Sequence, residues 1–502
     1  MSSQSRQGKF PFLDFLLRKP VVYKLAAAIA VNIILYFVFR SLFPNGEYIS
    51  DSHGYLVSAN QHHKVAFRPV GYSSFLNFMG LKGGSEGTLI GLQYLIMTCS
   101  SLLLYFTLAY FYPVRNRVVQ TLAYLLICFN LMNFFIANFI LSDGLFTALT
   151  VLIFVLLLWI HNTGRWIYLL ILLPLLYFTF TVRFNSLYYP FFIVVALLLS
   201  YRMKLMVRIA GCLAIALSFA SFYVGQQRLN EELYDSRVFS GFSGWQLANN
   251  ALYIYPHIQP EAEWFDSPDL KQLHKFVDSF YYQMDSAALQ PILQNKYEGA
   301  SFIWNPKSPL KIFLVYKLRT TKTHYFKAWV QYSELYNEYG NILIKKNPGT
   351  FIRHYITYNA KNFAYPLPEA FTDWNFKTAA IPDVTLQWFP DASVKDNIKH
   401  RSLNDAIVQA YRILYGLLIL GCFAGTVYLL FRMYRSRELS FKNEAFRLHF
   451  FTGAYFFMTA AFSIYASVVV FRNVLPLIPL CLMWLYLMYY YLENSRKQPT
   501  NQ

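Results

Sequence analysis

The sequence predicts an all-α polytopic membrane protein, a bundle of about ten transmembrane helices with an extracytoplasmic, mainly helical domain. Two observations carry this prediction. Of the 502 residues, 56% are hydrophobic and only 14% are charged, whereas roughly a quarter are charged in an ordinary soluble domain. Apolar runs near the length of helix that crosses a bilayer, about 20 residues, recur along the chain with arginine and lysine between them.

The apolar runs give the approximate limits of the spans. In chain order they are residues 21–39, 88–111, 118–141, 145–160, 166–182, 187–201, 209–224, 407–430, 448–468 and 474–491. The first run follows a basic start that resembles a signal peptide. Because no clear small-residue cleavage site follows it, we expect an uncleaved first helix.

The basic residues of the short loops predict the orientation. With the N-terminus in the cytoplasm, the basic loops all lie inside: residues 115–117, 165, 202–208, 432–447 and 496–497. Both termini are then cytoplasmic, and contact with anionic lipid accounts for most of the formal charge of +18. The charge therefore gives no reason to expect a nucleic-acid partner.

This topology divides the chain into three parts. Residues 1–224 form an N-terminal transmembrane module with a first outer loop at 40–87, residues 225–406 form an extracytoplasmic domain, and residues 407–502 hold the C-terminal transmembrane helices and a cytoplasmic tail. In the outer domain, Asn347 is a plausible N-cap before Pro348. All five cysteines fall in predicted spans, so neither a disulfide framework nor a zinc site is expected.

The first outer loop is unusually polar and holds the stretch "SDSHGYLVSANQHHKVAFRPVGYSSFL". A short helix at its start places Asp51 and Tyr55 on one face, at a spacing of i, i+4. Arg68 precedes Pro69, which suits the start of a second helix that lies on the membrane surface. Asp51 is then either a helix cap on a solvated loop or a carboxylate that serves as a general base, and its chemistry alone leaves both open.

Three more charged residues stand at outer helix ends. Asp143, in "ILSDGLFTAL", is either the N-cap of the next helix or a second carboxylate at the depth of Asp51. Arg183, in "VRFNSLYYP", and Arg472, in "FRNVLPLIPL", lie where the positive-inside tendency disfavours arginine. Each either snorkels to lipid phosphate or uses its fork of donors to bind a phosphate that joins lipid to sugar.

The histidines of the first outer loop are weaker candidates. His53, His62 and His63 are of the right type for phosphate contacts or for a metal ligand. Adjacent histidines on one turn usually face solvent, however, and no metal-ligand spacing links the histidines of the chain.

These segments, in this order and on one side, resemble the GT-C superfamily of integral membrane glycosyltransferases, particularly the branch of protein O-mannosyltransferases and bacterial aminoarabinose transferases. The resemblance covers residues 1–190 and the final span, and it is carried by "SDSHGYLVSA", "FRPVGYSSFL", "ILSDGLFTAL", "VRFNSLYYP" and "FRNVLPLIPL". By position, Asp51 matches the family's acidic residue in the first outer loop. Arg68 matches its Arg-Pro turn, and Asp143 matches an acidic residue of the second outer loop.

The resemblance implies a GT-C-like bundle in a bacterial inner membrane that moves a sugar, with inversion, from a polyprenyl-phosphate carrier to an acceptor outside. The acceptor class stays open between lipid, glycan and protein. Asp51 would be the catalytic general base, and the substrate-binding residues would be Tyr55, Arg68, Asp143, Arg183 and Arg472. No metal ligand is assigned, because the first loop lacks the paired acids of an Asp-x-Asp motif. A divalent cation stays an open alternative.

Two other classes of function compete with the enzyme. A transporter or flippase of a lipid-linked or anionic solute would place ionisable groups near the bilayer midplane, whereas here the charges cluster at helix ends. A non-catalytic scaffold built on a degenerate enzyme fold would leave the charged residues facing separate regions, with no shared cavity.

Overall fold

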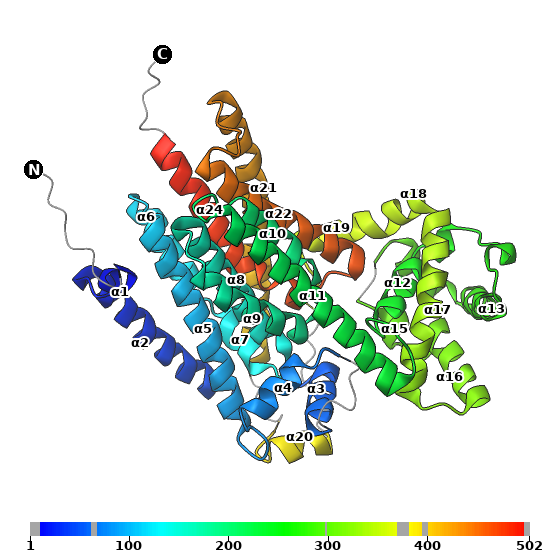
Figure 1. Cartoon of the computed structure of the whole chain (residues 1–502). Helices are drawn as coiled ribbons and strands as arrows, with labels where there is room; N and C mark the ends of the chain where they lie inside the picture. Colours follow the sequence, from blue (N-terminus) through cyan, green and yellow to red (C-terminus); the bar gives the residue numbers. More distant parts are fainter. Residues whose placement is uncertain (1–10, 62–67, 297–298, 369–380, 394–399, 496–502) are drawn as a thin grey trace, which may run out of the picture.

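The computed structural model describes residues 11–61, 68–296, 299–368, 381–393 and 400–495. This part of the chain is helical, and its only strand-like pairings are two isolated bridges, Glu47 with Phe139 and Leu367 with Val470. Figure 1 shows a helical bundle with a second group of helices, α12 to α18, beside it. The short α1 and the C-terminal end of α24 lie at one end of the bundle, and α3, α4 and α20 lie at the other (Figure 1).

Seven helices of the described chain are long and apolar enough to cross a membrane. They are α2 (Lys19–Leu42), α5 (Glu86–Phe111), α6 with α7 (Arg117–Cys128 and Met132–Asn138), α8 (Ser142–Thr163), α11 (Leu205–Tyr234), α21 (Arg401–Arg435) and α23 with α24 (Phe471–Val474 and Leu477–Ser495). This supports the predicted all-α polytopic class. The short α1 (Pro11–Leu16) precedes them.

The three other predicted spans are helices that differ from a regular span. α9 (Ile167–Val182) has 16 residues with Pro174 inside it, and α10 (Tyr189–Leu198) has 10 residues after the 3₁₀ turn η1 (Phe184–Tyr188). α22 (Glu444–Ala466) has 23 residues, but His449, Thr452 and Thr459 lie buried among its aromatic residues. The count of about ten spans therefore stays a prediction.

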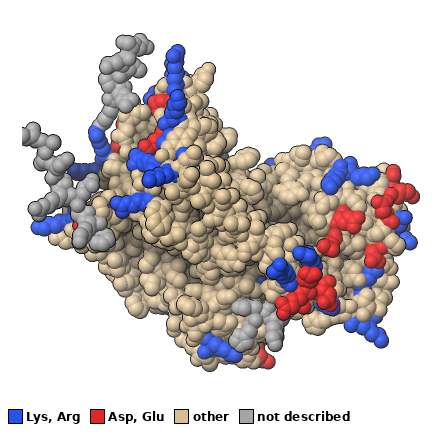
Figure 2. Space-filling view, in the orientation of Figure 1, with Lys and Arg blue, Asp and Glu red and all other residues tan. Residues whose placement is uncertain are grey.

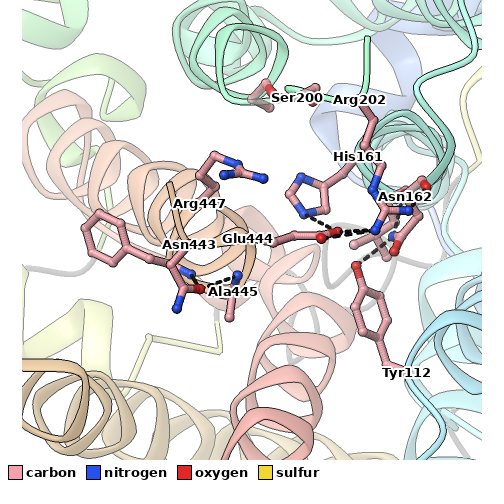
Figure 3. A network of polar contacts seen from close by, with 12 residues as sticks. Tyr112, His161, Asn162, Ser200, Arg202, Asn443, Glu444, Ala445 and Arg447 are labelled. Carbon is pink, nitrogen blue, oxygen red and sulfur yellow. Dashed lines mark hydrogen bonds and ion pairs between the residues drawn. The ribbon is translucent and has the colours of Figure 1, made fainter. Parts of the chain in front are cut away.

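The basic loops meet at the bundle end that carries α1 and the C-terminal end of α24. Arg202, after α10, lies 2.9 Å from Glu444 at the start of α22, and Glu493 of α24 accepts a hydrogen bond from the Arg115 backbone (2.8 Å). Figure 3 shows Glu444 between Arg202 and His161 of α8. Lysine and arginine gather at this end in Figure 2. The short basic loops thus share one end, as predicted, while their cytoplasmic orientation stays a prediction.

The opposite end holds the first outer loop, which contains the two predicted short helices. These are α3 (Ser50–Asn60) and α4 (Gly71–Phe78). α4 begins at Gly71 and not at Pro69, and Tyr72 and Leu76 are fully buried against the protein. Only the C-terminal Phe78 presents a large exposed side chain, at 88%. The described residues of the loop are therefore mostly part of the packed bundle end.

A short helix from the 225–406 segment covers this loop. α20 (Asp383–Trp388) lies beside α3, and the Trp388 carbonyl accepts a hydrogen bond from Gly83 N (2.9 Å). Asp391 accepts a hydrogen bond from the Glu86 backbone (3.2 Å). Trp388 and Phe389 belong to the hydrophobic core of the bundle, so this part of the segment packs with the membrane module.

Apart from Phe363, which belongs to the core of the bundle, most of the rest of the segment has its own hydrophobic core. Its helices are α12 (Ser243–Leu252), α13 (Pro268–Gln283), α14 (Ser286–Leu293), α15 (Ser301–Trp304), α16 (Pro309–Thr321), α17 (Tyr325–Lys346), α18 (Pro348–Phe351) and α19 (Thr357–Ala364), with 3₁₀ turns η2 (Tyr255–His257) and η3 (Ala262–Trp264) and a π-turn, η4 (Ile352–Ile356). Fully buried Trp245, Trp329 and Tyr336 lie at its centre. Asn347 is the N-cap residue of α18, with Pro348 after it, as predicted, but its side chain makes no cap hydrogen bond: the amide donates backwards to the Leu343 carbonyl (3.1 Å).

Candidate functional site

A cavity of about 610 Å³ lies between the bundle end and the helices α12 to α18, which are called the outer domain after their predicted side. Its size is within the roughly 300–1,000 Å³ of small-molecule sites. The six residues singled out from the sequence all line it. They come from α3, the turn before α4, α8, the end of α9 and α23: Asp51, Tyr55, Arg68, Asp143, Arg183 and Arg472. The structure therefore brings together groups that lie up to 421 positions apart in the chain.

Asp51 lies between two arginines. Its Oδ1 is 2.6 Å from Nη2 of Arg68, and its Oδ2 accepts a hydrogen bond from Nη1 of Arg472 (2.9 Å). Burial alone would raise the pKa of Asp51, but the two guanidinium groups outweigh it and hold the pKa well below its usual range. Asp51 is therefore ionised at neutral pH and, while both arginines contact it, it is a weaker base than an ordinary aspartate.

Asp143 forms a second acid–arginine pair. Arg183 donates from Nη1 to Asp143 and from Nη2 to Oδ1 of Asn473 (3.1 Å), and its guanidinium lies 5.7 Å from the centroid of the Phe146 ring. The Asp143 side chain is 4% exposed and that of Arg183 is 16% exposed. Asn473 follows Arg472 directly in α23, so this short helix contacts both pairs.

These contacts decide between the structural alternatives of the sequence analysis. Neither aspartate caps its helix: Ile49 is the N-cap of α3, where Ser52 Oγ accepts from the Ile49 N–H (3.0 Å), and α8 begins without a side-chain cap. The snorkelling interpretation of Arg183 and Arg472 is also wrong, because both side chains contact the cavity acids and are only 16–17% exposed. At the cavity wall Asp51 pairs with Arg472, as well as with Arg68, and Asp143 pairs with Arg183.

Tyr55 joins the short helices to the start of α8. Its hydroxyl forms a hydrogen bond with Ser142 Oγ (2.8 Å), its ring packs edge-on against Tyr72 at 4.9 Å, and its carbonyl accepts from Ser73 Oγ (2.9 Å). The Arg68 guanidinium lies 5.9 Å from its ring centroid. Burial raises the pKa of Tyr55, so its hydroxyl is neutral at physiological pH. Tyr55 thus holds the acid–arginine wall in position.

The cavity has one positive charge in excess. Among the described lining residues, the charged groups are three arginines and two aspartates, and all five come from the membrane module and the C-terminal helices. The outer domain contributes only uncharged groups, among them Ser240, Phe242, Ser243, Gln246, Asn250, Trp304, Asn337 and Asn341. Sequence reasoning missed this wall, because amides and aromatic residues in a segment without a recognisable motif gave no signal.

Of the three histidines of the first outer loop, the structure describes only His53. His53 is exposed on α3 and does not line the cavity, whereas His62 and His63 lie outside the described residues. Within the described ranges, no group of three or more His, Cys, Asp or Glu side chains is placed to hold a metal ion. Both cavity acids already contact arginine, so the donor set does not fit a divalent cation. The expectation that no residue is a metal ligand stays a prediction, with a divalent cation as its alternative.

Comparisons with protein-family models, with curated proteins and with solved structures find no match for this chain. The resemblance to the GT-C superfamily therefore rests on the sequence segments alone, and it stays a prediction.

Proposed function

We propose that this chain is a membrane glycosyltransferase that moves a sugar, with inversion, from a polyprenyl-phosphate-linked donor to an acceptor on the extracytoplasmic side. One observation carries the proposal: three arginines and two aspartates converge in one cavity at an end of the helical bundle. The excess positive charge suits the phosphate of the donor, which the planar fork of a guanidinium can bind with two hydrogen bonds. The carboxylate of Asp51 suits the proton of an acceptor hydroxyl.

In this reaction the oxygen of an acceptor hydroxyl attacks the anomeric carbon of the sugar from the side opposite the phosphate. The bond from that carbon to the phosphate oxygen breaks, and the lipid phosphate leaves with the electron pair. Asp51 takes the hydroxyl proton, while Arg68, Arg183 and Arg472 stabilise the charge on the departing phosphate.

The ion pairs of Asp51 give the donor a part in activating the base. A donor phosphate competes with Asp51 for Arg68 and Arg472, because both anions need the same guanidinium groups. As the arginines turn to the phosphate, Asp51 loses the charges that depress its pKa and becomes a stronger base. The carboxylate is then reactive only when the donor is present.

The competing functions are less well supported. A transporter needs ionisable groups near the bilayer midplane, whereas the five charged residues of the cavity lie at helix ends or in the loops beside them. A scaffold with scattered relics of a site would leave its charges on separate surfaces. Here they share one cavity, which favours the enzyme.

The test is Asp51→Asn in proteoliposomes supplied with radiolabelled polyprenyl-phosphate sugars. We expect the transfer rate to fall about 10²–10⁴-fold, the usual contribution of a positioned general base. Asp269→Asn is the matched control, since Asp269 is 54% exposed on α13 and pairs with Lys317 away from the cavity. Transfer by Asp51→Asn at the wild-type rate would refute the role of Asp51, and solute uptake without product would favour the transporter.

A further inference from the structure

The cavity wall that faces the acid–arginine cluster belongs to the outer domain and differs from it in chemistry. Residues of α12, α15 and α17 line this side, and those that the structure describes carry no charged group into the cavity. Asn250 anchors the wall to the bundle, because its amide donates to the backbone carbonyls of Tyr465 and Ala466 at the end of α22 (both 3.0 Å). An occupant of the cavity therefore meets charge on one side and neutral polar groups on the other.

Two pairs of amides form the polar part of this wall. Gln246 and Asn250 stand one turn apart on α12, and Gln246 Nε2 donates to Asn250 Oδ1 (3.2 Å). Asn337 and Asn341 repeat this spacing on α17, where Asn341 Nδ2 donates to the Asn337 carbonyl (2.9 Å). The two helices pack directly together, with Gly244 N donating to Ser333 Oγ (3.2 Å). Asn250 is 1% exposed and its amide is used within the protein, so it positions Gln246 rather than binding a ligand. Gln246, Asn337 and Asn341 are less buried, and an amide carries both donors and acceptors, which is the pattern needed to bind a series of hydroxyl groups.

Trp304 supplies a flat apolar surface beside the amides. It lines the cavity and is 45% exposed. Behind it stand Phe242 and Trp329, with ring centroids 5.6 and 6.1 Å from that of Trp304. Lys311 fixes this aromatic group: its Nζ lies 3.9 Å from the Trp329 centroid and donates to the Tyr325 hydroxyl (2.7 Å). The indole is thus held in place rather than left free to collapse into the cavity.

Lys311 is partly buried among these rings, and its cation–π contacts hold the aromatic group together from within the domain. Burial among these rings lowers the pKa of Lys311 to about 8. Most of the lysine is still protonated at neutral pH, so the cation–π contacts persist there. A ligand at Trp304 then meets a preformed surface, which reduces the ordering cost of binding.

We infer that this wall binds a neutral saccharide, so that the acceptor of the proposed transfer is a glycan rather than a charged peptide or lipid headgroup. The inference rests on the proposed function for its link to sugar transfer, but the binding surface stands on its own contacts. One face of a sugar ring is made of C–H groups that pack on an indole, while its hydroxyls reach the amides of α12 and α17. A charged ligand would lose hydration against this wall without gaining an opposite charge.

The experiment is saturation-transfer difference NMR on the full chain in nanodiscs. The probes are neutral trisaccharides of glucose, mannose, galactose and N-acetylglucosamine, together with a hexapeptide that contains lysine and glutamate. We expect saturation transfer from the protein to the ring protons of at least one trisaccharide. Trp304→Ala should bind that trisaccharide about tenfold more weakly, and Asn341→Ala should lose less affinity. Trp264→Ala is the matched control, because Trp264 lies in the same domain but does not line the cavity.

Three results would overturn the inference: no trisaccharide binds, binding is unchanged in both Trp304→Ala and Asn341→Ala, or the peptide gives the Trp304-dependent signal instead. Thermal unfolding of each variant shows whether it is folded. If Trp304→Ala does not fold, Asn341→Ala still tests the inference. The measurement reads binding and not transfer. Saccharide binding by a chain without transferase activity would refute the proposed function alone, and transfer to a peptide without saccharide binding would refute only this inference.

Discussion

Gly71 sets the distance between the first outer loop and the end of α9, and Gly71→Ala should disturb both stability and the cavity. A Cβ at Gly71 would lie 2.5 Å from the carbonyl carbon and 2.6 Å from the carbonyl oxygen of Thr181. Ordinary contacts of a Cβ begin near 3.4 Å, so α4 and α9 must separate by about 0.9 Å. Neither partner is a flexible side-chain end. Overpacking of this kind costs about 1–3 kcal/mol.

The separation would also shift the arginines. Gly71 is three residues after Arg68, and Thr181 is two residues before Arg183, so the added methyl group moves two of the three cavity arginines apart. A misplacement near 1 Å can slow a reaction by about 10²-fold. We expect Gly71→Ala to lower the thermal unfolding temperature in nanodiscs and, if the proposed function holds, to reduce sugar transfer by about that factor.

Gly225→Ala is the control, because a Cβ there meets nothing within 4 Å. Its unfolding temperature should stay near or above that of the wild type, since alanine favours a helix by about 1 kcal/mol over glycine. Hydrogen exchange of the α4 amides reports the local change independently of any activity. A Gly71→Ala chain with wild-type unfolding temperature and wild-type exchange in α4 would refute the close-contact argument.

Three further predictions concern single side chains. Because the folded-state pKa of Asp51 lies below its unfolded value, its contribution to stability is present above the ordinary carboxyl pKa and is lost as the pH falls below about 5. Arg472→Ala should flatten this part of the profile of stability against pH. A profile unchanged by the substitution would contradict this role of the Asp51–Arg472 pair. Asn359 of α19 is fully buried; it donates to the Ile464 carbonyl (2.7 Å) and accepts from Val469 N (2.8 Å). Asn359→Ala should therefore lower the free energy of unfolding by about 1–3 kcal/mol in denaturant. A loss below about 0.5 kcal/mol would show that these hydrogen bonds do not hold α19 to the end of α22. Glu444 is 44% exposed in its ion pair with Arg202, so Glu444→Gln should lower the free energy of unfolding by no more than about 1 kcal/mol, and by less in high salt. A larger loss that does not change with salt would contradict the exposed setting of this ion pair.

The fold class followed from the sequence because crossing a membrane imposes long apolar segments. Arg117–Asn138 and Phe471–Ser495 were each predicted within a few residues, although both are interrupted helices. The interruptions were not predicted, since the apolar pattern runs on through the break between α6 and α7. The packing of α20 on α3 was also out of reach, because it joins distant segments by contacts that leave no periodicity in either.

The site followed from the sequence as a set of residues but not as a set of pairs. Charged groups in an apolar chain are few, so a shared side of the membrane was enough to group Asp51, Asp143, Arg183 and Arg472. Which acid meets which arginine depends on how the helices are packed, and this changes the chemistry: Asp51 was expected as a base, and the structure shows it held by two cations. The amides of α12 and α17 were missed because nothing in their order distinguishes them from a surface helix.

The contact between Asp51 and Arg472 also bears on how the protein is made. The two residues are 421 positions apart, and domains form from the N-terminus onward as the ribosome elongates the chain. Asp51 is therefore inserted early with Arg68 as its neighbour, and the second guanidinium arrives only after the outer domain and two more long helices have been synthesised. An unfinished chain lacks this closing contact. The full charged cluster can therefore form only after translation has passed residue 472.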